Sequence, residues 1–192
     1  MTMRWEPGKP VYLETERFIL RSVSPLWLAY QTLPWTEDPQ IMSPFNHRTG
    51  GWSVWSWRKT MVHANNRRKF LLGIFPKTTQ MLIGFETITI DRNGIGSWAV
   101  MIGDKDWWGQ GAVLETRQRL LQFLFEDVGC PKVWGMPNVR NFPAVFNYNR
   151  LGFVQEGLLR QHVRSIDDED RNDLVVFGLL KSEWQEQQGR TR

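Results

Sequence analysis

The amino-acid sequence predicts a single α/β domain, built on a mixed, mostly antiparallel central sheet with helices on both faces. Three observations lead to this fold class. Three strand-like runs follow one another with short turns between them, as in antiparallel sheets. A long segment of helical periodicity comes next. The C-terminal third then alternates strand, helix and two further strands, which makes the predicted sheet mixed.

The N-terminal half begins with a predicted strand at residues 17–21, where polar and apolar side chains alternate. A short helix is expected over residues 25–32. A longer helix is expected over residues 52–66, with aromatic side chains on one face. The three strand-like runs follow, and the joints between them have the composition of hairpin turns. These runs cover residues 69–75, 81–90 and 96–102.

The C-terminal half begins with a predicted helix after Gly111, in which apolar residues recur every three or four positions as far as Val128. Gly129 and Pro131 are typical of a helix end. A short strand at residues 132–136 and a helix from Asn141 to Gly152 follow. Two last strands, at residues 153–164 and 174–180, are joined by an acidic turn at residues 167–170.

Length and composition indicate an ordinary globular protein. The chain has 192 residues, 41% hydrophobic and 23% charged, which suits one domain with a sizeable core. No apolar run reaches the roughly 18 residues of a membrane span, and the N-terminus has no apolar stretch typical of a signal peptide. One cysteine excludes an internal disulfide. We therefore expect a cytoplasmic protein that does not bind a membrane.

The most informative stretch is DWWGQGA at residues 106–112, which follows a predicted strand and opens a helix. Gly109 and Gly111 would let the backbone approach a ligand without a clash from a Cβ. The first helical turn leaves backbone N–H groups unpaired, and with the helix dipole they favour an anion such as a diphosphate. A simple structural turn is the alternative. The longer glycine patterns of dinucleotide and nucleoside-triphosphate sites are absent.

A second signature lies downstream, where Asn141, Ala144 and Tyr148 are spaced by three and four residues and would share one helix face. A tyrosine hydroxyl can give a proton to a leaving thiolate, because the pKa of a phenol is near that of a thiol. The alternative for Tyr148 is a ring packed on the sheet with its hydroxyl at the rim.

Together the two signatures resemble the GNAT acetyltransferase superfamily, nearest the branch that acetylates the alanine or serine N-termini of ribosomal proteins. Residues 108–113 match the W-G-x-G form of its phosphate turn, and Glu115 matches an acidic residue of the following helix. The resemblance runs from about residue 13 to residue 184. The later family motif, N-x-x-A-x-x-x-Y-x-x-x-G-F, is matched by Asn141, Ala144, Tyr148, Gly152 and Phe153.

This resemblance implies acetyl-CoA as cosubstrate, a primary amine as acceptor, direct attack on the thioester and no metal ion. It implies that backbone amides from Gln110 to Val113 hold the diphosphate, that a strand edge pairs with the pantetheine arm, and that Tyr148 is the general acid. The acceptor would be a protein N-terminus or a small molecule. The implied cofactor-binding residues are Val100, Met101, Ile102, Trp108, Gly109, Gln110, Gly111, Ala112, Val113, Asn141, Ala144 and Tyr148.

Two residues depart from the family pattern. Val113 replaces a small residue at the end of the phosphate turn, although its N–H remains available. Trp98 stands where relatives often carry a glutamate that takes the amine proton. Glu86 is the predicted base in its place, because a carboxylate in an apolar strand can have a raised pKa. Asp104 is a second candidate base, and a solvent-facing position is the alternative for Glu86.

The acceptor, the partners and the function class leave alternatives open. Residues 33–66 are rich in aromatic side chains, which favours an acceptor with an apolar or planar part; His47 lies in this segment as a surface or an acceptor-site residue. A non-catalytic acyl-CoA-binding module is the main alternative. The formal charge of +4 allows nucleic-acid binding, which we do not expect because no basic block dominates. The resemblance is consistent with a monomer or a homodimer.

Overall fold

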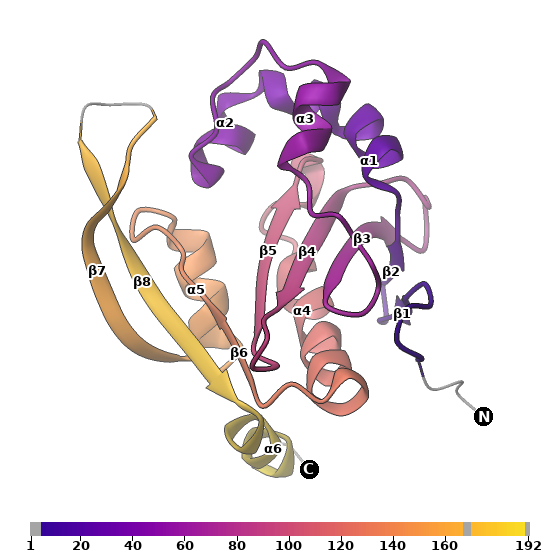
Figure 1. Cartoon of the computed structure of the whole chain (residues 1–192), viewed down its shortest axis with the longest axis vertical. Helices are drawn as coiled ribbons and strands as arrows, with labels where there is room; N and C mark the ends of the chain where they lie inside the picture. Colours follow the sequence, from indigo (N-terminus) through magenta and orange to yellow (C-terminus); the bar gives the residue numbers. More distant parts are fainter. Residues whose placement is uncertain (1–4, 167–169, 191–192) are drawn as a thin grey trace.

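The computed structural model describes residues 5–166 and 170–190, so most of the acidic turn predicted at residues 167–170 lies outside the described residues. Eight strands form one sheet in the order β1-β2-β3-β4-β5-β6-β8-β7 (Figure 1). All neighbours pair antiparallel except β5 and β6, which are parallel, so the predicted fold class is confirmed. The strands are β1 (Tyr12–Glu14), β2 (Phe18–Ser22), β3 (Lys69–Pro76), β4 (Gly84–Ile90), β5 (Gly96–Ile102), β6 (Lys132–Gly135), β7 (Val154–Arg164) and β8 (Arg171–Leu180).

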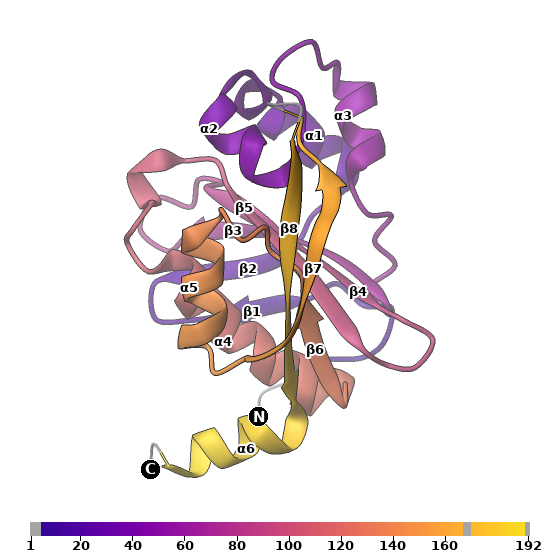
Figure 2. The same ribbon diagram turned by 90° about the vertical axis from the view of Figure 1, so that its left-hand side faces the viewer.

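Helices cover both faces of the sheet (Figures 1 and 2). Successive side chains of a strand point to opposite faces, so Phe70, Leu72 and Ile74 of β3 pack in one hydrophobic cluster and Leu71 packs in the other. The first cluster includes residues of α4 and α5, and the second includes residues of α1, α2 and α3. The helices are α1 (Pro25–Thr32), α2 (Pro39–Met42), α3 (Val54–Thr60), α4 (Ala112–Gln122), α5 (Phe142–Arg150) and α6 (Lys181–Arg190).

Local capping explains where the N-terminal helices begin and end. Ser24 caps α1 by accepting from the N–H of Trp27, and Ser53 forms a capping box with Ser56 at the start of α3. The helix predicted over residues 52–66 is too long, because α3 ends at Thr60. Beyond it, the Asn65 side chain accepts from the N–H groups of residues 67, 68 and 69, which turns the chain into β3.

Two other predicted elements differ from the structure. The opening strand is preceded by a separate strand, β1, because Thr15 accepts from the N–H of Phe18 and turns the chain back on itself. The last strand was expected to close the chain, but α6 follows it directly, and Glu183 accepts from the N–H of Leu180 at the start of that helix. The predicted helix after Gly111 is confirmed, with its last turn, residues 123–128, wound as a π-helix up to Gly129.

The sheet divides between β5 and β6. These strands pair only through Gly96 with Val133 and Ser97 with Trp134. Beyond β6 the chain keeps following β8: Val175 N–H donates to the Pro137 carbonyl at 3.0 Å, and Asn138 bridges Leu174. Among the described residues, the edge of β5 from residue 98 to residue 102 therefore has no strand beside it on this side. The two halves of the sheet separate there (Figure 1).

The β7–β8 hairpin reaches across this opening to the segment around α2 (Figures 1 and 2). The Asn46 amide joins the two. Its Nδ2 donates to the Arg164 carbonyl at 2.7 Å, and its Oδ1 accepts from the Ile166 N–H at 2.8 Å. Asn46 has a φ of 55°, a left-handed conformation that asparagine tolerates well. The opening is thus bounded on one side by β5 and on the other by α5 and the hairpin.

Candidate active site

A cleft of about 660 Å³ occupies the opening between β5 and β6. One end is formed by Trp107, Trp108 and the start of α4. The middle is formed by β5, Arg117 of α4 and the face of α5 that carries Asn141, Ala144 and Tyr148. The rest of the wall is formed by residues 40–41 and 44–46, residues 136–138 and the hairpin. The cleft is long, mostly apolar and open to solvent, as sites for small molecules commonly are.

The start of α4 presents free backbone donors to the cleft. Gly109 and Gly111 have φ values of 72° and 75°, and residues 111–114 contribute to the cleft wall. Within the described part of the chain, no hydrogen-bond acceptor takes the N–H groups of Gly111, Ala112, Val113 and Leu114. The Gln110 N–H instead donates to the Trp107 carbonyl at 3.4 Å. The available donors are therefore displaced by one residue from the predicted stretch, and Val113 keeps its N–H available.

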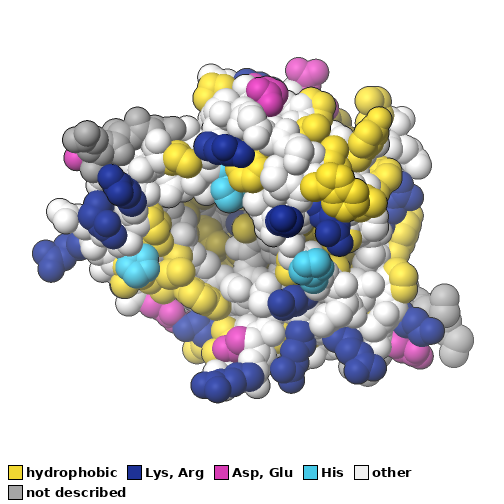
Figure 3. Space-filling view, turned by 45° about the horizontal axis from the view of Figure 1, so that its top comes forward, with side chains coloured by type: hydrophobic (Ala, Val, Ile, Leu, Met, Phe, Trp, Pro, Cys, Tyr) yellow, Lys and Arg dark blue, Asp and Glu magenta, His cyan; other side chains and the backbone are white. Residues whose placement is uncertain are grey.

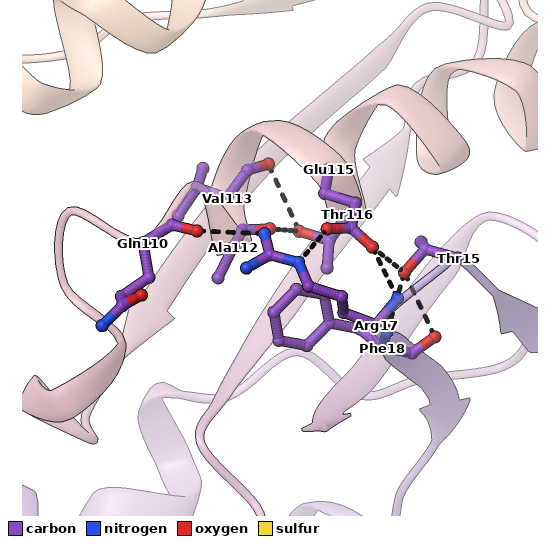
Figure 4. A network of polar contacts seen from close by, with 8 residues as sticks. All are labelled: Thr15, Arg17, Phe18, Gln110, Ala112, Val113, Glu115 and Thr116. Carbon is purple, nitrogen blue, oxygen red and sulfur yellow. Dashed lines mark hydrogen bonds and ion pairs between the residues drawn. The ribbon is translucent and has the colours of Figure 1, made fainter. Parts of the chain in front are cut away.

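A network behind this turn holds it in position (Figure 4). The Glu115 carboxylate accepts from Thr15 Oγ1 at 2.6 Å, from the Arg17 backbone N–H at 2.8 Å and from Arg17 Nε at 2.6 Å. Arg17 Nη2 also donates to the Gln110 carbonyl at 3.0 Å. Burial acts to raise the pKa of Glu115, but the hydrogen bonds from Thr15 and Arg17 hold it below its ordinary value. Arg17, itself held by Glu115, thus fixes the Gln110 carbonyl of the turn.

Tyr148 lies in the middle of the cleft with most of its ring buried. Its hydroxyl oxygen accepts from Trp98 Nε1 at 3.0 Å, and its ring stacks on Phe177 with centroids 5.0 Å apart. Burial raises the pKa of Tyr148, and the charge of Arg117 and the Trp98 hydrogen bond offset part of that effect. Tyr148 therefore stays protonated at neutral pH and can serve as a proton donor.

A buried ion pair lies beside Tyr148 and Trp98. Arg117 Nε is 3.1 Å from Glu86 Oε1, and the guanidinium lies 4.5 Å from the Trp98 ring centroid. Glu86 has no exposed surface, and no group among the described residues bonds to its Oε2. Burial raises the pKa of Glu86 to about 7, with the charge of Arg117 opposing the rise. The raised pKa predicted for this carboxylate is confirmed, and its predicted solvent-facing alternative is wrong.

Most of the predicted site residues do meet in the cleft. Three do not line it: Met101 points its side chain into the opposite core, the Gln110 side chain bonds to the Asp106 carbonyl, and Glu86 lies beneath Arg117. The position of Glu86 favours a counter-ion for Arg117 over a base that meets the amine. The predicted residues that line the cleft are Val100, Ile102, Trp108, Gly109, Gly111, Ala112, Val113, Asn141, Ala144 and Tyr148.

Two of these residues have partly occupied polar groups. The Ile102 carbonyl on the free edge of β5 accepts from Trp108 Nε1 at 2.9 Å. Asn141 caps α5, with its Oδ1 accepting from the Ala144 N–H at 3.1 Å, which leaves its NH₂ group for a ligand. The edge available to an extended ligand is therefore shorter than predicted and ends before Ile102.

The remaining candidates lie outside the cleft wall. Asp104 caps a short turn by accepting from the Asp106 N–H. His47 lies between the rings of Trp52 and Trp57, with centroids 6.0 and 5.9 Å away, and burial lowers its pKa. Of the aromatic residues in the predicted acceptor segment, residues 33–66, Phe45 lines the cleft, whereas Trp57 is part of the core.

Sequence reasoning missed Arg117 and Gly135. Arg117 falls on the apolar stripe of α4, and a charged residue on a buried stripe requires a buried partner of opposite charge. The carboxylate in the apolar strand β4 was the matching signal. Gly135 was not identifiable, because its role is to leave room: a Cβ there would overlap the Tyr148 hydroxyl.

The cleft wall is poor in charge. Among the described residues that form it there is no aspartate, glutamate or histidine, and Arg117 is its one charged side chain. The face of the molecule in Figure 3 is hollowed at its centre, and Lys and Arg side chains gather around the hollow. Within residues 5–166 and 170–190, no three metal-ligating side chains form a group that could hold a metal ion, and no helix is long and apolar enough to cross a membrane.

A family model described as an acetyltransferase (GNAT) domain matches residues 17–154, and the chain belongs to this family. The resemblance inferred from the sequence is thereby confirmed. An uncharacterized N-acetyltransferase p20 of Bacillus licheniformis is 29% identical over 114 residues, which cover 58% of this chain and 62% of that protein. The chain thus spans less than two thirds of that relative's length.

Solved structures share the fold at low identity. A GNAT-family acetyltransferase from Bacillus anthracis has a TM-score of 0.76 and 13% identity, covering 90% of this chain and all of that one. A Vibrio cholerae spermidine N-acetyltransferase in complex with CoA and spermine has a TM-score of 0.72 and 18% identity, covering 88% and 98%. A ribosomal-protein-S5-alanine acetyltransferase from Vibrio fischeri has a TM-score of 0.73 and 16% identity, covering 91% and 98%.

Substitution of Gly111 by valine should weaken binding of acetyl-CoA by at least about tenfold in a calorimetric titration. A branched side chain is strained at a φ of 75° and would lie beside the free N–H groups. Loss of even one hydrogen bond to a charged group corresponds to about tenfold. Gly157→Val is the matched control, because a Cβ at Gly157 meets no atom within 4 Å. Equal affinity of the two variants would contradict an anion site at this turn.

Glu86→Gln should alter the pH dependence of stability. The pKa of Glu86 is raised from 4.5 to about 7 on folding, so its contribution to stability is fully present below pH 4.5 and is lost as the pH rises through 7. The unfolding free energy of the variant minus that of the wild type should therefore rise by roughly 2–4 kcal/mol as the pH is raised from 4.5 to about 8. Urea unfolding at several pH values measures this. Glu14→Gln, an exposed carboxylate paired with Lys77, should show no such gain.

Proposed function

We propose that this chain transfers an acetyl group from acetyl-CoA to a primary amine by direct attack of the amine on the thioester. One observation carries the proposal: a single cleft combines four free N–H groups at the start of α4 with the buried hydroxyl of Tyr148. The first suits a diphosphate and the second suits a leaving thiolate. In this proposal residues 1–192 form one domain, active without a metal ion, in the cytoplasm, as a monomer or a homodimer.

Three groups would hold the cosubstrate. The N–H groups of Gly111 to Leu114 would bind the diphosphate oxygens, because they are unpaired and lie at the positive end of the α4 dipole. The free edge of β5 near Val100 would pair with the amides of the pantetheine arm as an added strand. The Asn141 NH₂ group would donate to the same arm. All three line the one cleft that also contains Tyr148.

The proton balance of the reaction matches this set of residues. Attack by a neutral amine forms a C–N bond and breaks the C–S bond, so the nitrogen loses one proton and the sulfur gains one. Tyr148 would give its hydroxyl proton to the departing sulfur and recover a proton from the amine through water. A separate general base is then unnecessary, which is consistent with the absence of aspartate, glutamate and histidine from the described cleft wall.

The cleft also constrains the acceptor. An ammonium group would meet no carboxylate in the described wall and would lie near the positive charge of Arg117. Where the predicted acceptor segment borders the cleft, Ile41, Pro44 and Phe45 give it an apolar surface. These features favour an amine that is neutral near pH 7 and carries an apolar or planar part, such as a peptide N-terminus or a small aromatic amine, over a polycation.

A non-catalytic acyl-CoA-binding module is the second candidate. Trp98, where relatives often carry a glutamate, and the lack of a carboxylate in the described cleft wall favour it. Both candidates predict binding of acetyl-CoA, and they differ in turnover alone.

Thiol release with a panel of amines, beside a binding titration with acetyl-CoA, separates these candidates. The panel contains a dipeptide with a free N-terminus, a small aromatic amine, spermidine and an aminoglycoside. We expect thiol release with the dipeptide or the aromatic amine and little with the two polycations. Binding without turnover on any amine would favour the module, and reaction with polycations alone would contradict the proposed acceptor class.

Tyr148→Phe should lower kcat by roughly ten- to a thousand-fold, the range for one acid–base group, with little change in the affinity for acetyl-CoA. The variant keeps the ring that stacks on Phe177 and removes only the hydroxyl. Steady-state kinetics and calorimetry measure the two quantities. Tyr30→Phe, which alters an exposed hydroxyl on α1, is the matched control. An unchanged kcat in Tyr148→Phe would show that Tyr148 is not the acid.

A further inference from the structure

We propose that Trp98 is a positioning residue that directs the hydroxyl proton of Tyr148 into the cleft. This inference rests on the proposed function, in which that proton goes to the leaving sulfur. It assigns a role to the residue that departs most clearly from the family pattern. Trp98 would act through Tyr148 and would not itself exchange a proton with either substrate.

Two side chains that can only donate hydrogen bonds lie beside Tyr148. Trp98 Nε1 donates to it at 3.0 Å, and an indole has no acceptor. The guanidinium of Arg117 lies 4.5 Å from the Trp98 ring centroid and 5.5 Å from the Tyr148 ring centroid, and it too can only donate. Trp98 is 6% exposed, Tyr148 4% and Arg117 3%, so little water competes for these contacts.

The donors leave one direction for the hydroxyl proton. A tyrosine hydroxyl both accepts and donates, and here Trp98 uses its acceptor side. Within the described part of the chain, no acceptor takes the Tyr148 O–H. Tyr148 lines the cleft, so its proton can bond to an acceptor that enters there. A carboxylate at position 98 would have the opposite effect, because it would accept the proton and hold it away from the cleft.

The ring and the donors are held rigidly. Tyr148 stacks on Phe177 with an interplanar angle of 2° and meets Phe153 edge-on with centroids 5.0 Å apart. Behind the hydroxyl, Gly135 leaves the space that a methyl group would fill. The Glu86 carboxylate holds Arg117 from the other side at 3.1 Å. The orientation of the O–H group is therefore set before either substrate enters.

The test is a double-mutant cycle with the amine that gives the fastest thiol release. Trp98→Phe keeps an aromatic ring and removes the N–H donor. It should lower kcat by roughly three- to tenfold, the value of one neutral hydrogen bond, and leave the KM for acetyl-CoA nearly unchanged. In the Tyr148→Phe background the same change should have little effect. Trp184→Phe, a buried tryptophan that packs on Phe125 outside the cleft, is the control.

A second variant alters the same contact without changing either residue. Gly135→Ala introduces a methyl group where the Tyr148 hydroxyl lies. It should lower kcat in the wild type and cost less in Tyr148→Phe, whose ring lacks the oxygen but keeps Cζ 2.7 Å from the new methyl group. An equal loss of activity from Trp98→Phe in both backgrounds would show a packing role alone and would overturn the proposal.

A measurement without any acceptor separates this inference from the proposed function. The chain has three tyrosines, of which Tyr12 and Tyr30 are exposed, so labelling the tyrosine Cζ atoms with carbon-13 gives three NMR signals. The signal that disappears in Tyr148→Phe is that of Tyr148. Trp98→Phe should shift the Tyr148 signal and leave the other two unchanged. An unmoved Tyr148 signal would refute the positioning role even in an active enzyme. A shifted signal in a protein that turns over no amine would support the contact between Trp98 and Tyr148 and contradict the proposed acetyl transfer.

Discussion

The structure depends on one constraint in its sheet: β5 and β6 pair through two residues and then part. They part because the chain beyond β6 continues to bond to β8, through Pro137 and Asn138, and so cannot also follow β5. A strand edge is thereby left open in the middle of a sheet, where edges are normally covered. The start of α4 and the face of α5 border the same opening, which brings residues distant in sequence into one cleft.

A buried cluster of polar groups lies between the sheet and α4, beside the middle of the cleft. Glu86 and Arg117 come from β4 and α4, and their side chains meet between sheet and helix. Breaking such a pair by removing one partner commonly costs 3–5 kcal/mol, since a buried charge is left alone. The pair nevertheless contributes more than stability here, because it holds the guanidinium against Trp98 and Tyr148. The polar groups beside the Tyr148 ring are therefore hydrogen-bond donors, those of Trp98 and Arg117.

Periodicity and turn chemistry predict most of the fold, since strand alternation, helical spacing and the stop at Gly129 are local signals. The donors at the start of α4 were predictable for the same reason, apart from their displacement by one residue, which follows from a local bond between the Gln110 N–H and the Trp107 carbonyl. The end of α3 was not predicted, because Asn65 redirects the chain through side-chain hydrogen bonds. Gly135 could not be derived, because its role depends on how distant segments pack, whereas the pairing of Glu86 with Arg117 was signalled only by two charges in apolar elements.

Three of the eleven tryptophans, Trp98, Trp107 and Trp108, form part of the cleft wall. The emission of an indole depends on its contact with water. A ligand that fills the cleft removes water from the rings of Trp107 and Trp108 and changes the surroundings of the nearly buried Trp98, whereas tryptophans away from the cleft keep theirs. The protein thus contains an intrinsic fluorescent reporter of occupancy, spread from the start of α4 to the middle of the cleft, and ligand entry can be followed in real time on the unlabelled chain.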